Sequence, residues 1–380
     1  MPSEKSPTYQ IITTERQLID MADELQQEPV VGFDLEADSM FHFKERVCLV
    51  QLATPRRHAI LDTLALKDLS PLKPLFRDAR IRKVFHGADY DVRSLFRDFD
   101  IRITNLFDTQ LACRFLGFRE TGLEAVLKNL FAVALDKKYQ RKDWSRRPLP
   151  RQMLDYAVSD ARYLPPLAER LTAELQEKGR LAWVDEECRI LSKVRPGLTD
   201  GTPLFMSCKG AGRLEPRSLA VLEELLALRR RVAREKDRPM FKVFNAESLL
   251  ALADAKPSTT AELEKTGALS PSQIERYGEA ILAAIGTALR LPAAQLPRYP
   301  RKTSRAISAA TSERIQSLRR WRDAAARRLK IEPALVCSRA AMAAVAVRKP
   351  AQPEELAEVA ELRNWQRKMF GREILAALGR

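Results

Sequence analysis

Hydrophobic residues in the first half of the chain fall into short runs separated by helical patterns. Residues 30–35 (VVGFDL) form an apolar, β-branched run after a helical stretch at 14–26, and residues 82–86 form a second run before another helical pattern. Runs of this length and composition predict strands that are buried on both faces of an open sheet. We therefore expect an α/β domain in this half.

The second half of the chain has no comparable strand pattern. From about residue 212 onward, leucines and isoleucines recur at helical spacing. Two segments interrupt the helical patterns: residues 195–203 are rich in Pro, Gly and Asp, and residues 291–305 are rich in Pro and basic residues. We expect these segments to separate three domains, at residues 1–200, 212–292 and 308–380.

The two helical blocks resemble each other in sequence. Residues 238–244 (RPMFKVF) align with 332–338 (EPALVCS), and residues 277–285 (YGEAILAAI) align with 370–378 (FGREILAAL). The offset is 94 residues in the first case and 93 in the second, so one loop differs by a single residue. The blocks are interpreted as two copies of one module. Such a module serves either nucleic-acid binding or packing alone, and the pattern leaves both open.

Two carboxylates stand together at the end of the first predicted strand. Side chains alternate along a strand, so Asp34 and Glu36 point to the same face. Open α/β sheets bind ligands at the carboxyl ends of their strands. Neighbouring carboxylates repel each other unless a cation neutralises them, and hard oxygen ligands suit Mg²⁺ or Mn²⁺. For this motif alone, a solvated rim or a salt-bridged pair is the simpler alternative.

Two more acidic positions are candidates for the same site. Asp91 falls in the first turn of the helical pattern after the second strand, a position also favoured for helix capping. Tyr156 and Asp160 are four residues apart in a helical pattern, so they share one helix face. Each is an ordinary helix feature when taken alone. Their order and spacing after Asp34 and Glu36 favour one shared site.

The chain is strongly basic, with a formal net charge of +15 and a pI near 9.7. Residues 301–380 contain 18 Lys or Arg and 8 Asp or Glu, which is +10 of that charge. This asymmetry is typical of a protein that binds RNA phosphates. The candidate contacts are the cations of two segments and the histidine of the second acidic motif: Arg319, Arg320 and Arg322; Arg141, Lys142, Arg146 and Arg147; and His86. The alternatives are solvated basic surfaces and a structural histidine.

Cysteine usage and hydropathy narrow the class of protein. The five cysteines form no CxxC pair and their count is odd, which gives no indication of a zinc site or a disulfide framework. No apolar run approaches the roughly 18 residues of a membrane span. Residues 1–10 also lack the apolar core of a signal peptide. We expect a cytoplasmic protein without a membrane partner, and we favour a monomer.

Five motifs in the first 200 residues resemble those of a known nuclease family. They are FDLEAD at 33–38, HGADYD at 86–91, FDTQLACRFLG at 107–117, KDWSRRPL at 142–149 and LDYAVSDARYL at 154–164. The segment is similar to the Tyr-containing subgroup of the DEDD superfamily of 3′→5′ exonucleases, which includes ribonuclease D and the catalytic subunit of the nuclear exosome. The helical blocks resemble the helicase and ribonuclease D C-terminal (HRDC) domain, the second as a diverged copy.

The resemblance carries specific expectations. It implies a ribonuclease H-like α/β exonuclease domain with a central mixed sheet, followed by two all-α HRDC-type domains. It implies that Asp34, Glu36, Asp91 and Asp160 hold two divalent cations, Mg²⁺ or Mn²⁺, and that Tyr156 orients the attacking water. The implied reaction releases 5′-mononucleotides from RNA with a single-stranded 3′ end, such as precursor tRNA. A DNA exonuclease and an inactive nucleic-acid-binding scaffold are the alternatives.

Overall fold

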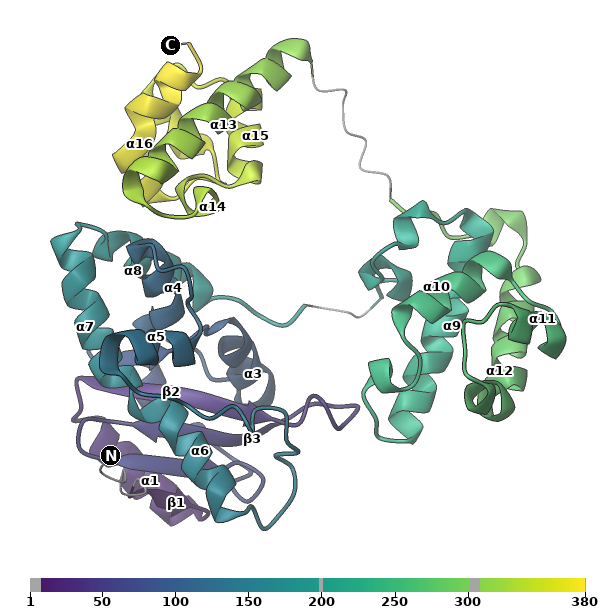
Figure 1. Ribbon diagram of the computed structural model, residues 1–380, viewed down its shortest axis with the longest axis horizontal. Helices are drawn as coiled ribbons and strands as arrows, with labels where there is room; N and C mark the ends of the chain where they lie inside the picture. Colours follow the sequence, from purple (N-terminus) through teal and green to yellow (C-terminus); the bar gives the residue numbers. More distant parts are fainter. Residues whose placement is uncertain (1–7, 198–200, 301–307, 380) are drawn as a thin grey trace. The chain divides into compact units, whose positions relative to one another are not determined.

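The computed structural model describes residues 8–197, 201–300 and 308–379. These residues form two compact units (Figure 1). The first unit holds the described residues up to Ala37, then Val47–Pro196, and the described residues from 308 onward. The second unit holds Asp38–Arg46 and the described residues between Gly197 and Ser304. The last helical block therefore belongs to the same unit as the sheet.

A six-stranded mixed sheet forms the centre of the first unit (Figure 1). Its strands are β1 (Gln10–Ile12), β2 (Val30–Ala37), β3 (Val47–Ala53), β4 (His58–Asp62), β5 (Arg82–Phe85) and β6 (Leu106–Asp108), in the spatial order β1-β4-β3-β2-β5-β6. β3 is antiparallel to both β2 and β4, and the other pairs are parallel. The predicted mixed sheet is confirmed, and the two predicted strands are β2 and β5.

Helices cover both faces of this sheet. On one face, the ring of Phe33 contacts that of Phe76 in α2 (Lys73–Arg77), with centroids 4.7 Å apart. On the other face, α6 (Arg151–Arg162) packs on β2, β3 and β4, and α7 (Leu164–Glu177) packs on β2 and β5. Gly32 permits the close approach of α7, because a Cβ at this position would lie 2.9 Å from the Cβ of Leu164.

The helical pattern that contains Tyr156 and Asp160 is divided into two helices. α6 ends at Arg162 and α7 begins at Leu164, with Pro165 in the first turn of α7. Proline has no backbone N–H to donate inside a helix, but it is tolerated in a first turn, where that N–H would lack a partner anyway. The break ends α6 just beyond Asp160.

The remaining helices of the first unit are α1 (Glu15–Leu25), α3 (Asp89–Phe99), α4 (Thr109–Leu116), α5 (Leu123–Phe131), α8 (Leu181–Leu191), α13 (Ala309–Leu329), α14 (Pro333–Val336), α15 (Arg339–Arg348) and α16 (Asn364–Ala377). The last four helices pack against the sheet-containing part of this unit through aromatic rings on α8 and α16. Trp183 and Trp365 are stacked, with centroids 4.6 Å apart and 19° between the ring planes. These two parts therefore share one hydrophobic core.

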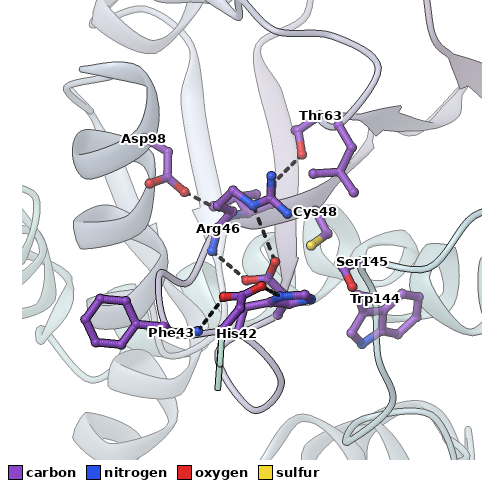
Figure 2. Close-up of polar contacts among 12 residues, drawn as sticks. His42, Phe43, Arg46, Cys48, Thr63, Asp98, Trp144 and Ser145 are labelled. Carbon is purple, nitrogen blue, oxygen red and sulfur yellow. Dashed lines mark hydrogen bonds and ion pairs between the residues drawn. The ribbon is translucent and has the colours of Figure 1, made fainter. Parts of the chain in front are cut away.

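The second unit is helical, with α9 (Pro216–Glu235), α10 (Ala246–Ala255), α11 (Thr260–Lys265) and α12 (Pro271–Leu289) around its own core. The segment Asp38–Arg46 is part of this unit, and Figure 2 shows the polar contacts of His42 and Phe43. Nδ1 of His42 lies 2.7 Å from Oδ2 of Asp237, and the backbone N–H of Phe43 donates to Oδ1 of the same carboxylate at 3.1 Å. No strand occurs in the described residues after Asp108, so the helical character predicted from about residue 212 onward is confirmed.

Candidate active site

β2 carries the first pair of predicted acidic residues to one end of the sheet. Asp34 and Glu36 lie on the same face of β2 as Gly32, which is the face covered by α6 and α7. A register shift between Glu36 and Ala37 interrupts the regular pairing with β3 directly after the acidic pair. Both carboxylates are therefore presented toward α6 at the carboxyl end of β2.

α6 supplies the third carboxylate. Asp160 follows Tyr156 by about one helical turn, so the two side chains share a face. The ligand oxygens of Asp34, Glu36 and Asp160 all lie within 4.8 Å of one another. Side chains more than 120 positions apart in the sequence thus converge within the reach of one metal ion.

Asp91 lies in the first turn of α3, where the helical pattern placed it, and is only 8% exposed. It is not a member of the group of three described above. Its charge nevertheless raises the pKa of both Asp34 and Glu36, so it adjoins the group. The fourth predicted carboxylate therefore borders the same site from a different helix.

Burial raises the pKa of every carboxyl group in the site. Burial is the larger cause for Asp34 and Glu36, whose pKa values stand well above the ordinary range, and the neighbouring carboxylates add to it. Burial raises the pKa of Asp160 to about 6 and that of Asp91 to about 7. Without a cation, these buried carboxyl groups resist ionisation. A divalent cation suits such a set of hard oxygen donors, because its charge would stabilise their ionised forms.

Tyr156 is held in a fixed orientation beside these carboxylates. Burial and then the charge of Asp160 raise the pKa of its phenol, so the hydroxyl keeps its proton and can donate a hydrogen bond. Its ring is close to two other aromatic rings, with centroids 5.9 Å from Tyr139 and 6.1 Å from Trp144. Neither flanking ring was predicted from the sequence as part of the site.

A cleft of about 1110 Å³ opens on Tyr156 and Asp160. Its wall is formed by the segment that leads into α5, by α5 itself, and by residues 135–140. Three cations (Arg119, Lys128 and Lys137) and three carboxylates (Glu120, Glu124 and Asp136) line it.

Comparison with known proteins shows what this architecture belongs to. A family model described as "3'-5' exonuclease" matches residues 9–176, and the HRDC domain model matches residues 218–285 and 312–378. The ribonuclease D of Granulibacter bethesdensis is 32% identical over 379 residues, which cover 97% of this chain and 92% of that protein. The chain belongs to the ribonuclease D family.

Further relatives agree with this assignment. The crystal structure of Escherichia coli RNase D matches with a TM-score of 0.74 at 26% identity, covering 98% of this chain and 99% of that one. The Arabidopsis thaliana protein RRP6-like 3 is 42% identical over 175 residues, which are 46% of this chain and 20% of that protein. The predicted family, fold class and 3′→5′ exoribonuclease activity are thus confirmed at the level of the ribonuclease D family.

The basic residues predicted near the site differ in their exposure and in their hydrogen-bond partners. Arg141 and Lys142 are exposed, and Arg146 is exposed although it lies 3.2 Å from Asp143. Arg147, in contrast, donates to both carboxylate oxygens of Asp62, at 2.6 and 2.7 Å, and to backbone oxygens. Because its donors are used within the chain, these contacts agree with a structural role for Arg147, and a contact with RNA stays a prediction.

The predicted basic residues of α13 also differ in their exposure. Arg319 and Arg320 are exposed. Arg322 has a side chain that is only 12% exposed, and it forms an ion pair with Asp323 at 2.7 Å. Arg319 and Arg320 remain available for RNA, whereas Arg322 is mostly buried within the helical block.

His86 lies between β5 and α3, close to the acidic motif that it begins. Its Nδ1 lies 2.9 Å from the hydroxyl of Thr109, and burial lowers the pKa of the imidazole. The ring is therefore neutral at physiological pH. A neutral, hydrogen-bonded histidine agrees with the structural alternative, and a contact with substrate stays a prediction.

Asp108 supports the site and was missed from the sequence. Its carboxylate accepts backbone hydrogen bonds from Gly87 and Ala88 at 2.9 Å each, and from Gln110 and Leu111 at 2.8 and 3.1 Å. It thereby caps α4 and fixes the turn that leads into α3 and Asp91. A carboxylate directly after a strand and before a helix is a helix-capping signal that was available in the sequence.

None of the helices in the described part of the chain is both long and apolar enough to cross a bilayer.

Proposed function

We propose that this chain removes 5′-mononucleotides one at a time from the 3′ ends of RNA and uses two divalent cations, Mg²⁺ or Mn²⁺, to do so. One observation carries the proposal: the oxygens of Asp34, Glu36 and Asp160 lie within 4.8 Å of one another beside Tyr156, in a member of the ribonuclease D family. Asp91 at the border of this group supports a second cation.

Each proposed role follows from the chemistry of the side chain. When bound, the cations would lower the pKa of the attacking water and offset charge on the departing 3′ oxygen. Asp34, Glu36 and Asp160 would hold one cation, and Asp91 would share in holding the other. Tyr156 keeps its proton, so its hydroxyl can donate a hydrogen bond and orient the water without adding charge.

The proposed substrate is RNA with a single-stranded 3′ end, with precursor tRNA as the example. The Escherichia coli relative is described as an exoribonuclease involved in structured RNA processing, and its fold covers nearly the whole of this chain. The exposed cations Arg141, Lys142 and Arg146, and Arg319 and Arg320 on α13, are the proposed phosphate contacts. All proposed catalytic residues come from one chain, so a monomer suffices, and we place its activity in the cytoplasm.

The decisive experiment compares RNA and DNA of equal sequence. Each oligonucleotide, labelled at its 5′ end, is incubated with the purified chain and Mg²⁺, Mn²⁺ or EDTA. The proposal predicts an RNA ladder that shortens by single nucleotides with either metal and no product with EDTA. Cleavage of DNA alone would indicate a DNA exonuclease, and RNA binding without cleavage under any metal condition would indicate an inactive scaffold.

A further inference from the structure

Gln51 on β3 is fully buried, and its amide has no hydrogen-bond partner within the part of the chain that the structure describes. Neither its nitrogen nor its oxygen is bonded. Buried polar side chains are otherwise almost always paired, because an unpaired amide in the protein interior loses the hydrogen bonds that water would provide. An unpaired, buried glutamine at such a position indicates a hydrogen-bond partner that forms only when a ligand is bound.

The sheet register shows where that partner lies. Gln51 stands directly opposite Asp34 in the antiparallel pair of β2 and β3, and directly opposite Ile60 in the pair of β3 and β4. Opposite residues of an antiparallel pair project from the same face, with Cβ atoms about 4.5–5.5 Å apart. The amide therefore lies on the face covered by α6, between the carboxylate of Asp34 and the apolar side chain of Ile60.

Of the two residues that pair with Gln51 across the sheet, Asp34 is the one with a polar side chain. Leu49 and Ile60 belong to an apolar cluster with Ala157 and Val158 of α6. None of these side chains can accept or donate a hydrogen bond. An amide at the end of a two-carbon side chain can reach across to a carboxylate on the neighbouring strand, whereas Ile60 on the other neighbouring strand offers no polar atom.

We propose that Gln51 is a positioning residue of the metal site: its amide N–H₂ donates to the ionised carboxylate of Asp34, and its carbonyl oxygen accepts from a water held in the site. This inference rests on the proposed function. The carboxylate of Asp34 has lone pairs that can accept from this amide, because the two residues stand directly opposite each other in the sheet.

The residue type fits the role. A lysine would supply a donor, but its positive charge would compete with a divalent cation for the carboxylates. A glutamate would add one more negative charge to a group whose members already repel one another. A neutral amide orients Asp34 and leaves the net charge of the site unchanged.

The test measures metal binding directly. Mn²⁺ is titrated into the full-length chain without RNA, with free Mn²⁺ followed by its electron paramagnetic resonance signal. Gln51→Met keeps the volume of the side chain and removes its hydrogen bonds. Loss of an interaction that orients a metal ligand typically weakens metal binding about 10- to 100-fold, so we expect the Mn²⁺ dissociation constant to rise by that factor. We also expect kcat to fall while KM for RNA changes little.

Leu52→Met is the matched control, because Leu52 is the next residue of β3, is equally buried, and projects from the opposite face of the sheet. This variant should bind Mn²⁺ like the wild-type chain. A merely structural role for Gln51 predicts altered unfolding by urea with unchanged Mn²⁺ affinity. Wild-type Mn²⁺ affinity in folded Gln51→Met would overturn the inference.

Two further outcomes are decisive. If Gln51→Met does not fold, Gln51→Asn replaces it, since a shorter amide cannot reach Asp34 in the same way; wild-type Mn²⁺ affinity in that variant would also overturn the inference. If the wild-type chain itself binds no Mn²⁺, both the proposed function and this inference are refuted. Binding by the wild-type chain with no effect of the Gln51 substitutions refutes the inference alone.

Discussion

Trp144 and Tyr156 are stacked, with ring centroids 6.1 Å apart and 28° between the ring planes. Trp144 is only 1% exposed, so the motif at 142–149 buries its indole behind the tyrosine that is proposed to orient the attacking water. The ring of Tyr139 is also close to that of Tyr156, with centroids 5.9 Å apart and 60° between the ring planes. The segment 141–147, which the sequence predicted as a basic RNA contact, thus also contacts Tyr156 through the ring of Trp144.

Tyr156→Phe should lower kcat and leave KM for RNA nearly unchanged, because the hydroxyl is proposed to act mainly in the transition state. Orienting or proton-handling groups typically contribute about 10²- to 10⁴-fold to the rate. Tyr139→Phe is the control, since it keeps the flanking ring and loses only a hydrogen bond to Gln152. Unchanged kcat in Tyr156→Phe together with a lower melting temperature would assign Tyr156 a structural role.

Asp34→Asn and Asp160→Asn should each abolish hydrolysis and weaken Mn²⁺ binding, because each removes one of three converging carboxylates. RNA binding, measured by fluorescence anisotropy with Ca²⁺ or EDTA, should be largely retained. Asp155→Asn is the matched control on α6, since Asp155 bonds to Tyr9 instead of facing the acidic group. Substantial turnover by either site variant with Mg²⁺ would contradict the proposed ligand set.

The stability of the metal-free protein should fall as pH rises from about 4 to about 7. The folded-state pKa values of Asp160 and Asp91 are about 6 and about 7, above the ordinary value of 3.8. In this window the native state binds more protons than the unfolded state, so the free energy of unfolding decreases with rising pH. This contribution is complete below the unfolded pKa and is lost as pH passes the folded pKa values.

Added Mn²⁺ should reverse this trend, because the cation binds the ionised carboxylates and competes with protons. Thermal melts in EDTA and in MnCl₂ at several pH values measure both effects. The increase in melting temperature caused by Mn²⁺ should be larger near pH 8 than near pH 5. An Asp91→Asn/Asp160→Asn double variant should lose a large part of both dependences, and equal pH profiles for this variant and the wild type would contradict the assignment.

Arg319→Gln/Arg320→Gln should weaken binding of long RNA and flatten the dependence of log K on log[salt]. Each lost phosphate contact removes about 0.7 from the slope for a single strand. Arg16→Gln/Arg56→Gln removes the same charge from exposed positions in α1 and the β3–β4 loop and should leave the slope unchanged. Identical slopes for the wild type and the α13 variant would reject RNA binding by this part of α13.

Gly117→Ala should destabilise the first unit. Gly117 has a φ of +89°, and a Cβ there would lie 2.1 Å from the backbone oxygen of Lys330 at the end of α13. Overpacking of this kind typically costs about 1–3 kcal/mol of the free energy of unfolding. Gly122→Ala, where a Cβ meets nothing within 4 Å, is the control. Wild-type stability of Gly117→Ala in urea would show that this approach of the two segments is not maintained in solution.

The sequence by itself determined most of the local structure, that is, the strands and helices around the site and the face on which each site residue lies. The apolar runs gave β2 and β5, the helical spacing put Tyr156 and Asp160 on one face of α6, and Asp91 fell in the first turn of α3 as expected. These features depend on side-chain periods of two or of about 3.6 residues within a single element. Periodicity is contained in the sequence itself, so such predictions need no knowledge of distant residues.

The tertiary structure alone decided which distant segments meet. Gln51 reads in the sequence as one polar residue within a strand, and only the pairing of β3 with β2 places it opposite Asp34. Trp144 reads as part of a basic loop, and only the packing of α6 on the sheet puts its ring behind Tyr156. The stack of Trp183 on Trp365 likewise joins the last helical block to the sheet-containing part. These contacts depend on which surfaces bury each other, and that choice is made by the fold as a whole, not by any local period.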